Sequence, residues 1–135
     1  MDEAFKDFLK DISVSFLQGN LPLWRSRLIL PLTITTKTEH TILRTEEEVA
    51  ENFGMYLKVR DALCVEVADR IPVMLEHSPD GTWVGTFQTR LLRNEALIEE
   101  PYTSTAIMQI VEDRFRMTTY VNARGHYQWT ERADA

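Results

Sequence analysis

The chain has 135 residues, 44% of them hydrophobic and 27% charged, which is typical of one globular domain that buries its own core. The formal net charge of −6 argues against a protein that binds nucleic acid through a positive surface. No apolar run reaches the length of a membrane span, and the acidic N-terminus differs from a basic secretory signal, so we expect a cytoplasmic protein without a membrane partner. Cys64 is the only cysteine, which excludes an internal disulfide and a metal site of the CxxC type.

Helix signals fill the N-terminal part of the chain. Gly19 is placed to end a first helix, because glycine readily adopts the left-handed conformation of a helix cap. Asn20 then caps a short second helix over residues 21–25, which has proline in its first turn. The apolar residues of the first helix recur at helical spacing and form one stripe: Phe5, Phe8, Leu9, Ile12 and Phe16. We therefore expect two helices, the first with one buried face.

A strand hairpin and a third helix come next. The β-branched residues over 29–44 predict two strands, with a turn near Glu39. Thr45 and Glu48 have the spacing of a capping box, and this pattern predicts a helix over residues 45–62.

The remainder of the chain, from Cys64 onward, reads as strands with few helix signals. The expected strands cover residues 64–77, 83–94, 102–112 and 115–127, and the first two are joined by the Ser-Pro-Asp-Gly turn of residues 78–81. On the first strand one parity is apolar and is expected to face the core: Val65, Val67, Ile71, Val73 and Leu75. Pro72 lacks a backbone donor, so this strand should lie at a sheet edge or carry a bulge.

This order of elements predicts one α+β domain over residues 1–135. Because helices come first and strands close the chain, we expect a curved antiparallel sheet wrapped around the N-terminal helices. A sheet of that shape encloses a pocket, and a pocket indicates a small ligand.

Two segments support this interpretation through a family resemblance. Residues 16–24 read FLQGNLPLW, and residues 45–53 read TEEEVAENF. They resemble the end of the first helix with the short second helix, and the capped third helix, of the nuclear transport factor 2-like superfamily. That superfamily includes polyketide cyclases, ketosteroid isomerase and scytalone dehydratase. The resemblance implies a strongly curved antiparallel sheet, a cone, that wraps around the N-terminal helices and encloses a hydrophobic cavity. It also implies a homodimer that forms through the outer sheet face.

The isomerases of that superfamily carry a general-base aspartate at the end of the first long strand and a tyrosine on the first helix. Here residues 33–37 read TITTK, without a carboxylate, and no tyrosine precedes Tyr56. The resemblance therefore does not transfer the isomerase mechanism to residues of this chain.

Asp69 and His77 are the acid–base candidates of the sequence. Asp69 shares the apolar parity of its strand, so a regular strand would point its carboxylate toward the apolar side as a general acid or base. The alternative is that a bulge near Pro72 turns Asp69 outward, or that an arginine pairs it. His77 can move protons near neutral pH, although the turn beside it favours exposure. The three histidines show no ligand spacing and no cofactor motif occurs, so we expect neither a metal nor a cofactor.

Four aromatic residues are the predicted pocket lining: Tyr56, Trp83, Phe87 and Tyr120. Trp83 and Phe87 share one strand face, and packing in the core is the commoner role of such a row. The sequence therefore predicts a domain that binds an unidentified small molecule, in one form a cofactor-free isomerase, cyclase or dehydratase acting on an apolar ring compound. The alternative is a non-catalytic assembly module, similar to the small subunit of aromatic-ring dioxygenases.

Overall fold

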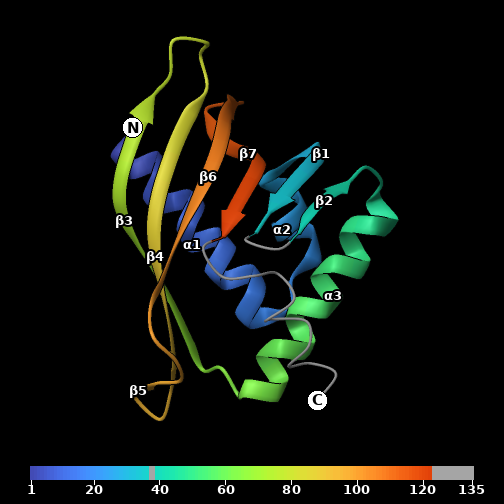
Figure 1. Ribbon diagram of the computed structural model, residues 1–135, viewed down its shortest axis with the longest axis vertical. Coiled ribbons are helices and arrows are strands. Elements are labelled where there is room, and N and C mark those ends of the chain that lie inside the picture. The colour runs from blue at the N-terminus through green and yellow to red at the C-terminus, as the bar shows by residue number, and fades with distance from the viewer. Residues whose placement is uncertain (37–38, 123–135) are drawn as a thin grey trace.

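The computed structural model describes residues 1–36 and 39–122. In this part of the chain, three helices pack against one sheet of seven strands (Figure 1). The helices are α1 (Asp2–Gln18), α2 (Leu21–Ser26) and α3 (Glu46–Leu63). The strands are β1 (Leu28–Thr35), β2 (His40–Leu43), β3 (Val67–His77), β4 (Trp83–Arg93), β5 (Ala96–Leu97), β6 (Tyr102–Val111) and β7 (Arg114–Asn122). The predicted α+β fold, with a curved sheet around N-terminal helices, is confirmed.

The sheet is mostly antiparallel and does not close on itself. Its strand order is β2-β1-β7-β6-β4-β3, with the short β5 paired to β4. Strands β1 and β7 form a parallel pair, whereas the other neighbouring strands are antiparallel. In Figure 1, α1 lies behind the long strands β3, β4 and β6, and α3 stands on the side of the molecule away from β3. The edges of the sheet are therefore β2 and β3.

Helix α1 forms and ends as its sequence predicts. Its buried stripe is Phe5, Phe8, Leu9, Ile12 and Phe16. Gly19 ends the helix in the left-handed conformation, with φ 67°, and the side chain of Asn20 caps α2 by accepting a hydrogen bond from Leu23 N–H at 3.1 Å. Gly85 of β4 allows α1 to pack closely, because a Cβ at this position would lie 2.6 Å from the ring of Phe5. The helix therefore rests directly on the inner face of the sheet.

Thr45 caps α3, as predicted. Its Oγ1 accepts a hydrogen bond from the backbone N–H of Glu48 at 3.1 Å, and the Glu48 carboxylate accepts hydrogen bonds from Arg44 N–H at 3.1 Å and from the Thr45 hydroxyl at 3.3 Å. Helix α3 ends at Cys64, which takes a left-handed φ of 53° and has an exposed side chain. The prediction that the next strand begins at Cys64 is wrong, because β3 begins at Val67.

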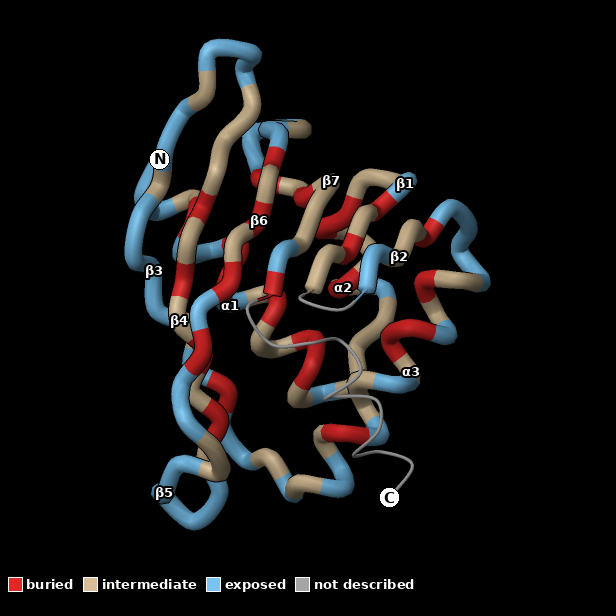
Figure 2. The backbone as a smooth tube through the Cα atoms, viewed as in Figure 1, coloured by how far each residue is buried: buried red, intermediate tan, exposed pale blue. Residues whose placement is uncertain are grey.

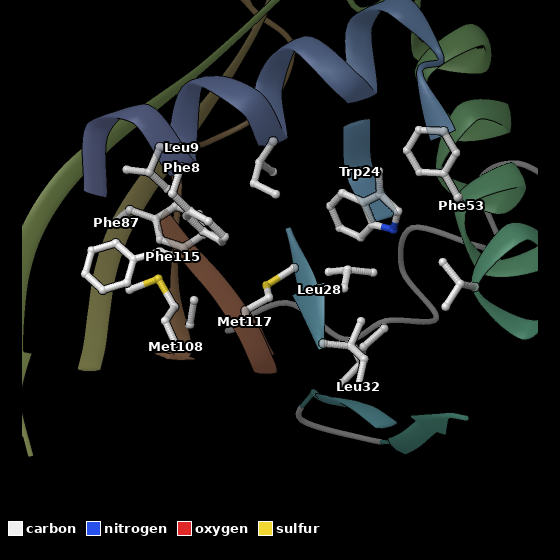
Figure 3. Close-up of a cluster of buried hydrophobic side chains, with 14 of the residues drawn as sticks. Phe8, Leu9, Trp24, Leu28, Leu32, Phe53, Phe87, Met108, Phe115 and Met117 are labelled. Carbon is white, nitrogen blue, oxygen red and sulfur yellow. The ribbon is translucent and has the colours of Figure 1, made fainter. Parts of the chain in front are cut away.

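The main hydrophobic cluster fills the space between α1 and the sheet. Figure 3 shows Phe8 of α1 close to Phe87 and Phe115 of the sheet. At the other end of the same view, Trp24 of α2 and Phe53 of α3 stand side by side. The core therefore connects all three helices to the sheet.

A second, smaller cluster includes the C-terminal end of α1. Its buried members are Phe16, Val59, Ala68, Leu91 and Tyr102. Tyr56 of α3 packs against both clusters, so the two meet at this residue.

The predicted side-chain directions of β3 are wrong before the register shift in this strand and correct after it for Leu75, which packs against the main cluster. Ala68 is buried and Arg70 is half-buried, whereas three residues of the predicted inner face are exposed: Val67, Ile71 and Val73. Figure 2 shows β3 largely exposed, in contrast to the alternating buried residues of β4. The expectation from Pro72 is correct in both respects, since β3 is an edge strand and its register shifts between Pro72 and Met74.

Other boundaries differ by a few residues. The hairpin between β1 and β2 has Thr36 N–H bonded to the carbonyl of Glu39, as expected for a turn there. The β6–β7 hairpin turns at Glu112 and Asp113, both with positive φ. Strand β5 was not predicted, and the predicted extension of the last strand over residues 123–127 lies outside the described residues.

Candidate ligand pocket

A cavity of about 40 Å³ lies between the three helices and the inner face of the sheet. Its lining consists of Ile12, Phe16, Trp24, Phe53, Tyr56, Arg70, Tyr102, Tyr120 and Asn122. A buried water needs roughly 10–15 Å³ of such space, so the cavity has room for about three waters. A cavity that binds benzene measures about 150 Å³ and pockets for drug-sized ligands measure roughly 300–1,000 Å³, so a single ring would enter this space only if lining side chains moved outward.

The register of the sheet explains why polar side chains meet here. Arg70 of β3 is paired with Thr89 of β4, which is paired with Tyr102 of β6. In the same way Ser104 of β6 is paired with Asn122 of β7. Directly opposite residues share one face of a sheet, and all of these except Arg70 are buried. The inner face therefore carries a polar region beneath the aromatic residues of the helices.

Three tyrosines line this region. The hydroxyl of Tyr120 donates a hydrogen bond to Ser104 Oγ at 3.2 Å. Desolvation raises the pKa of the Tyr56 and Tyr102 phenols above the usual range, and the nearby Tyr120 raises each pKa further. The positive charge of Arg70 acts on both phenols in the opposite direction. At neutral pH these phenols are therefore protonated.

Arg70 supplies the positive charge of the cavity. Its Nη1 donates a hydrogen bond to Ser13 Oγ at 2.9 Å, and its guanidinium lies 5.9 Å from the ring centroid of Phe16. Its Nε is buried and has no hydrogen-bond partner among the described residues. Within the described ranges no carboxylate forms an ion pair with Arg70. The described residues therefore leave this donor unused.

The opposite wall of the cavity is aromatic. The rings of Trp24 and Phe53 stack with centroids 5.6 Å apart, and Tyr56 meets Trp24 edge-on at 6.2 Å. The indole Nε1 of Trp24 is buried and has no hydrogen-bond partner among the residues described. This wall offers flat apolar surface and one further donor.

The predicted lining residues divide into two pairs. Tyr56 and Tyr120 line the cavity. Phe87 is buried in the main cluster, where its ring contacts Phe5 and Tyr120, and it does not border the cavity. Trp83 lies at the start of β4, away from the cavity.

Neither acid–base candidate borders the cavity. Asp69 is exposed, because Ala68 and Arg70 occupy the inner side of β3, so the expected inward direction of its carboxylate is wrong. His77 is also exposed, and its ring stacks on Trp83 with centroids 4.2 Å apart beside the hairpin turn. Their predicted catalytic role receives no support from this geometry.

Sequence reasoning missed most of the lining, and Arg70 is the most important omission. The alternating apolar residues around Asp69 indicated the wrong inner face of β3. Arg70 lies on the opposite side of the strand from Asp69, together with the buried Ala68. The bulge expected at Pro72 was the available signal, since a register shift there separates the directions of the two halves of the strand. Trp24 and Phe53 lie on helices and carry no distinct pocket signal in sequence.

Solved structures share this fold at low sequence identity. An NTF-2 like protein of unknown function from Shewanella oneidensis MR-1 matches with a TM-score of 0.69 and 12% identity, covering 90% of this chain and 98% of that one. A ketosteroid isomerase-like protein from Shewanella frigidimarina NCIMB 400 matches with a TM-score of 0.63 and 14% identity, covering 89% and 94%. A designed NTF2 fold matches with a TM-score of 0.68 and 6% identity, covering 90% and 98%. The chain therefore has the nuclear transport factor 2-like fold, and the predicted resemblance is confirmed for the fold.

Comparisons of sequence add no family. No family model matches the chain, and no curated protein matches it. Over residues 1–36 and 39–122, no group of three or more metal-binding side chains is placed to hold a metal ion. In the same part of the chain, none of the helices has the length and hydropathy to cross a membrane.

Proposed function

We propose that this chain is a small-molecule-binding domain whose ligand occupies the cavity between the helices and the sheet. The observation that carries the proposal is a pair of buried donors on lining residues, Trp24 Nε1 and Arg70 Nε, without partners among the described residues. Buried donors of this kind are rare, since each costs about 1–3 kcal/mol when unsatisfied. A ligand acceptor in the cavity would satisfy them.

The chemistry of the lining supports the same proposal. It combines aromatic walls with a few polar groups that converge on one space, which is the usual composition of a small-molecule site. The volume of about 40 Å³ favours a small ligand over the large ring systems of polyketides or steroids, and even a single ring requires lining side chains to move outward.

A catalytic form of this function would depend on hydrogen-bond donation. The described lining contains no carboxylate and no imidazole, and its desolvated phenols hold their protons. In an isomerase, cyclase or dehydratase reaction, these donors would polarise a carbonyl oxygen of the substrate. The proton acceptor would then have to come from outside the described lining.

Methyl-detected NMR tests the proposed site. We expect single-ring compounds such as phenol, benzamide and benzoate to shift the methyl resonances of Ile12, which lines the cavity. The substitution Ile12→Phe should fill the cavity and abolish these shifts. The matched control Ile107→Phe lies on the outer side of β6 and should preserve them, because its buried neighbours Ala106 and Met108 mark the inner side. Shifts that avoid Ile12 and persist in Ile12→Phe would contradict the proposal.

Assembly through the outer sheet face is the second candidate function. This face exposes apolar side chains on its edge strand and on β7: Val67, Ile71, Met74 and Val121. Strand β3 also leaves one row of backbone groups unpaired by any described strand. We propose a homodimer that buries this face, as the family resemblance implies.

Light scattering coupled to size-exclusion chromatography tests the homodimer. Ile71→Lys should convert a dimer to a monomer, because a charge would be buried at the interface. Met55→Lys introduces the same charge on α3, away from the sheet, and should leave the dimer intact. A monomer at all concentrations would contradict the proposal, and a stable complex with a different chain would favour the assembly module similar to a dioxygenase small subunit.

A further inference from the structure

We propose that the cavity binds a small aromatic carboxylate, with its ring against Trp24 and Phe53 and its carboxylate at the guanidinium of Arg70. This inference rests on the proposed binding function and adds the chemical class of the ligand. It follows from three features of the cavity: the contacts and unpaired donor of Arg70, the charges around Arg70, and the flat rings of the aromatic wall.

The guanidinium of Arg70 is held in place but not fully used. Ser13 Oγ accepts from Nη1 at 2.9 Å, and the ring of Phe16 supports the guanidinium plane from 5.9 Å. Because these two contacts already restrict the Arg70 side chain, binding of a ligand would cost less side-chain conformational entropy. The buried Nε remains without a partner in the described residues. A guanidinium donates two parallel hydrogen bonds to a carboxylate, which makes that group its best-matched acceptor.

Among the described residues, Arg70 has no counter-ion. On its outer side Arg70 also borders a groove between α1 and β3, which contains two residues of each sign: Lys6, Lys10, Glu66 and Asp69. Neither carboxylate of this groove forms an ion pair with Arg70. Glu99 lies near enough to act on the Tyr102 phenol, but it does not line the cavity. An anionic ligand would therefore supply the missing negative charge.

The aromatic wall specifies the rest of the molecule. Trp24 and Phe53 present stacked rings, and Phe16 and Tyr56 extend this apolar surface around the cavity. Flat rings pack well against such a wall, and the small volume of about 40 Å³ limits the ligand to at most one ring, which enters as lining side chains move outward. Acetate could bind only to the guanidinium, because it has no ring. Benzamide could pack against the aromatic wall but could form only hydrogen bonds of a neutral group with Arg70.

Isothermal titration with three probes tests the inference on the unaltered protein. Benzoate carries both the ring and the carboxylate, benzamide replaces the carboxylate by a neutral amide, and acetate lacks the ring. We expect benzoate to bind about 10–100-fold more tightly than benzamide, because hydrogen bonds to charged groups are the stronger ones. Acetate should bind more weakly than benzoate by a similar factor.

Arginine substitutions then locate the charge. Arg70→Gln should reduce benzoate affinity about 10–100-fold and leave benzamide affinity nearly unchanged. The matched control Arg90→Gln removes the same charge from β4, at the position paired with exposed Asp69, and should preserve benzoate binding. Should Arg70→Gln fail to fold, Arg70→Lys keeps the charge without the planar fork and should still lose affinity for benzoate.

The outcomes separate the two proposals. Equal affinity for benzoate and benzamide would overturn the carboxylate inference and leave the proposed binding function standing. Binding of neither benzoate nor benzamide would overturn both. Benzoate binding that is unchanged in Arg70→Gln, with Ile12 resonances still shifted, would overturn the assignment to Arg70.

Discussion

Arg27 and Arg70 both contact helix α1, and their surroundings differ sharply. Arg27 follows α2 and is 1% exposed; its Nε donates to Asp11 at 2.9 Å and its Nη2 lies 2.6 Å from Asp7. Its Nη1 donates to the backbone carbonyl of Phe115 at 3.0 Å, and Arg114 completes the ion-pair cluster from outside. Arg27 therefore has two counter-ions and connects α1 to the sheet.

Arg70 contacts the other half of α1 with far fewer partners. It has one hydrogen bond to Ser13, one aromatic contact and a buried donor without a described partner. A protein that needed Arg70 only for stability would be expected to pair it as it pairs Arg27, because an unpaired buried charge is costly. The difference favours a structural role for Arg27 and supports the proposed role of Arg70 in ligand binding.

The largest expected effect follows from removing each arginine in turn. Arg27→Met should lower the free energy of unfolding by about 3–5 kcal/mol, because Asp7 and Asp11 lose the buried partner that holds them. Arg70→Met should change it by about 1 kcal/mol or less, since it removes one hydrogen bond and relieves an unpaired charge. Urea unfolding of both variants measures the difference. Equal losses would remove the distinction between the two arginines.

A smaller effect is expected from acid at the Arg27 cluster. The hydrogen bond from Arg114, and then that from Arg27, lowers the pKa of Asp7 below its ordinary value. A lowered pKa contributes stability above the ordinary aspartate value of about 3.9, and this contribution is lost as the pH falls through the lower value of the folded protein. The Asp7 side chain is 51% exposed, so the effect should be about 1 kcal/mol or less.

Unfolding measured at several acid pH values tests this dependence. Asp7→Asn should remove part of the stability lost in acid. The control Asp2→Asn should not, because Asp2 forms no ion pair with a described residue. An acid dependence that is unchanged in Asp7→Asn would contradict the role of this cluster.

The smallest effect concerns the phenols beside Arg70. Tyr56 and Tyr102 have raised pKa values, so their contribution to stability is complete below the ordinary tyrosine pKa of about 10 and declines as the pH rises above it. In Arg70→Met the pKa of both phenols should rise further, because the positive charge that favours phenolate is gone. Ultraviolet titration measures phenolate, with Tyr56→Phe and Tyr102→Phe assigning each step. Titration of both phenols near the ordinary value would contradict a desolvated cavity.

Local signals in the sequence predicted the local structure well. Gly19, Asn20 and Thr45 each act within a few residues of their own position, and each makes the predicted cap. The buried stripe of α1 was predictable because apolar residues at helical spacing mark the face of the helix that packs against the core. Together with the order of elements, these signals were sufficient for the fold.

The candidate site could not be predicted in the same way, because it depends on strand β3. Strand β3 is an edge strand whose apolar side is exposed, which is the reverse of the usual burial of apolar residues. The alternation of apolar residues therefore indicated Asp69, and not Arg70, as the inward residue. The partners of Arg70 come from α1, and those of Trp24 come from α3. Contacts between residues so far apart in the chain depend on strand register and packing, which cannot be predicted from a single sequence in this way.

A crystal structure of the protein soaked in benzoate directly tests whether the cavity binds a small aromatic carboxylate. We expect the benzoate ring in the cavity beside Trp24 and Phe53, with its carboxylate in hydrogen-bonding contact with the Arg70 guanidinium. A cavity that contains only water while benzoate occupies surface sites, or a guanidinium paired with a carboxylate of the chain itself, would contradict it.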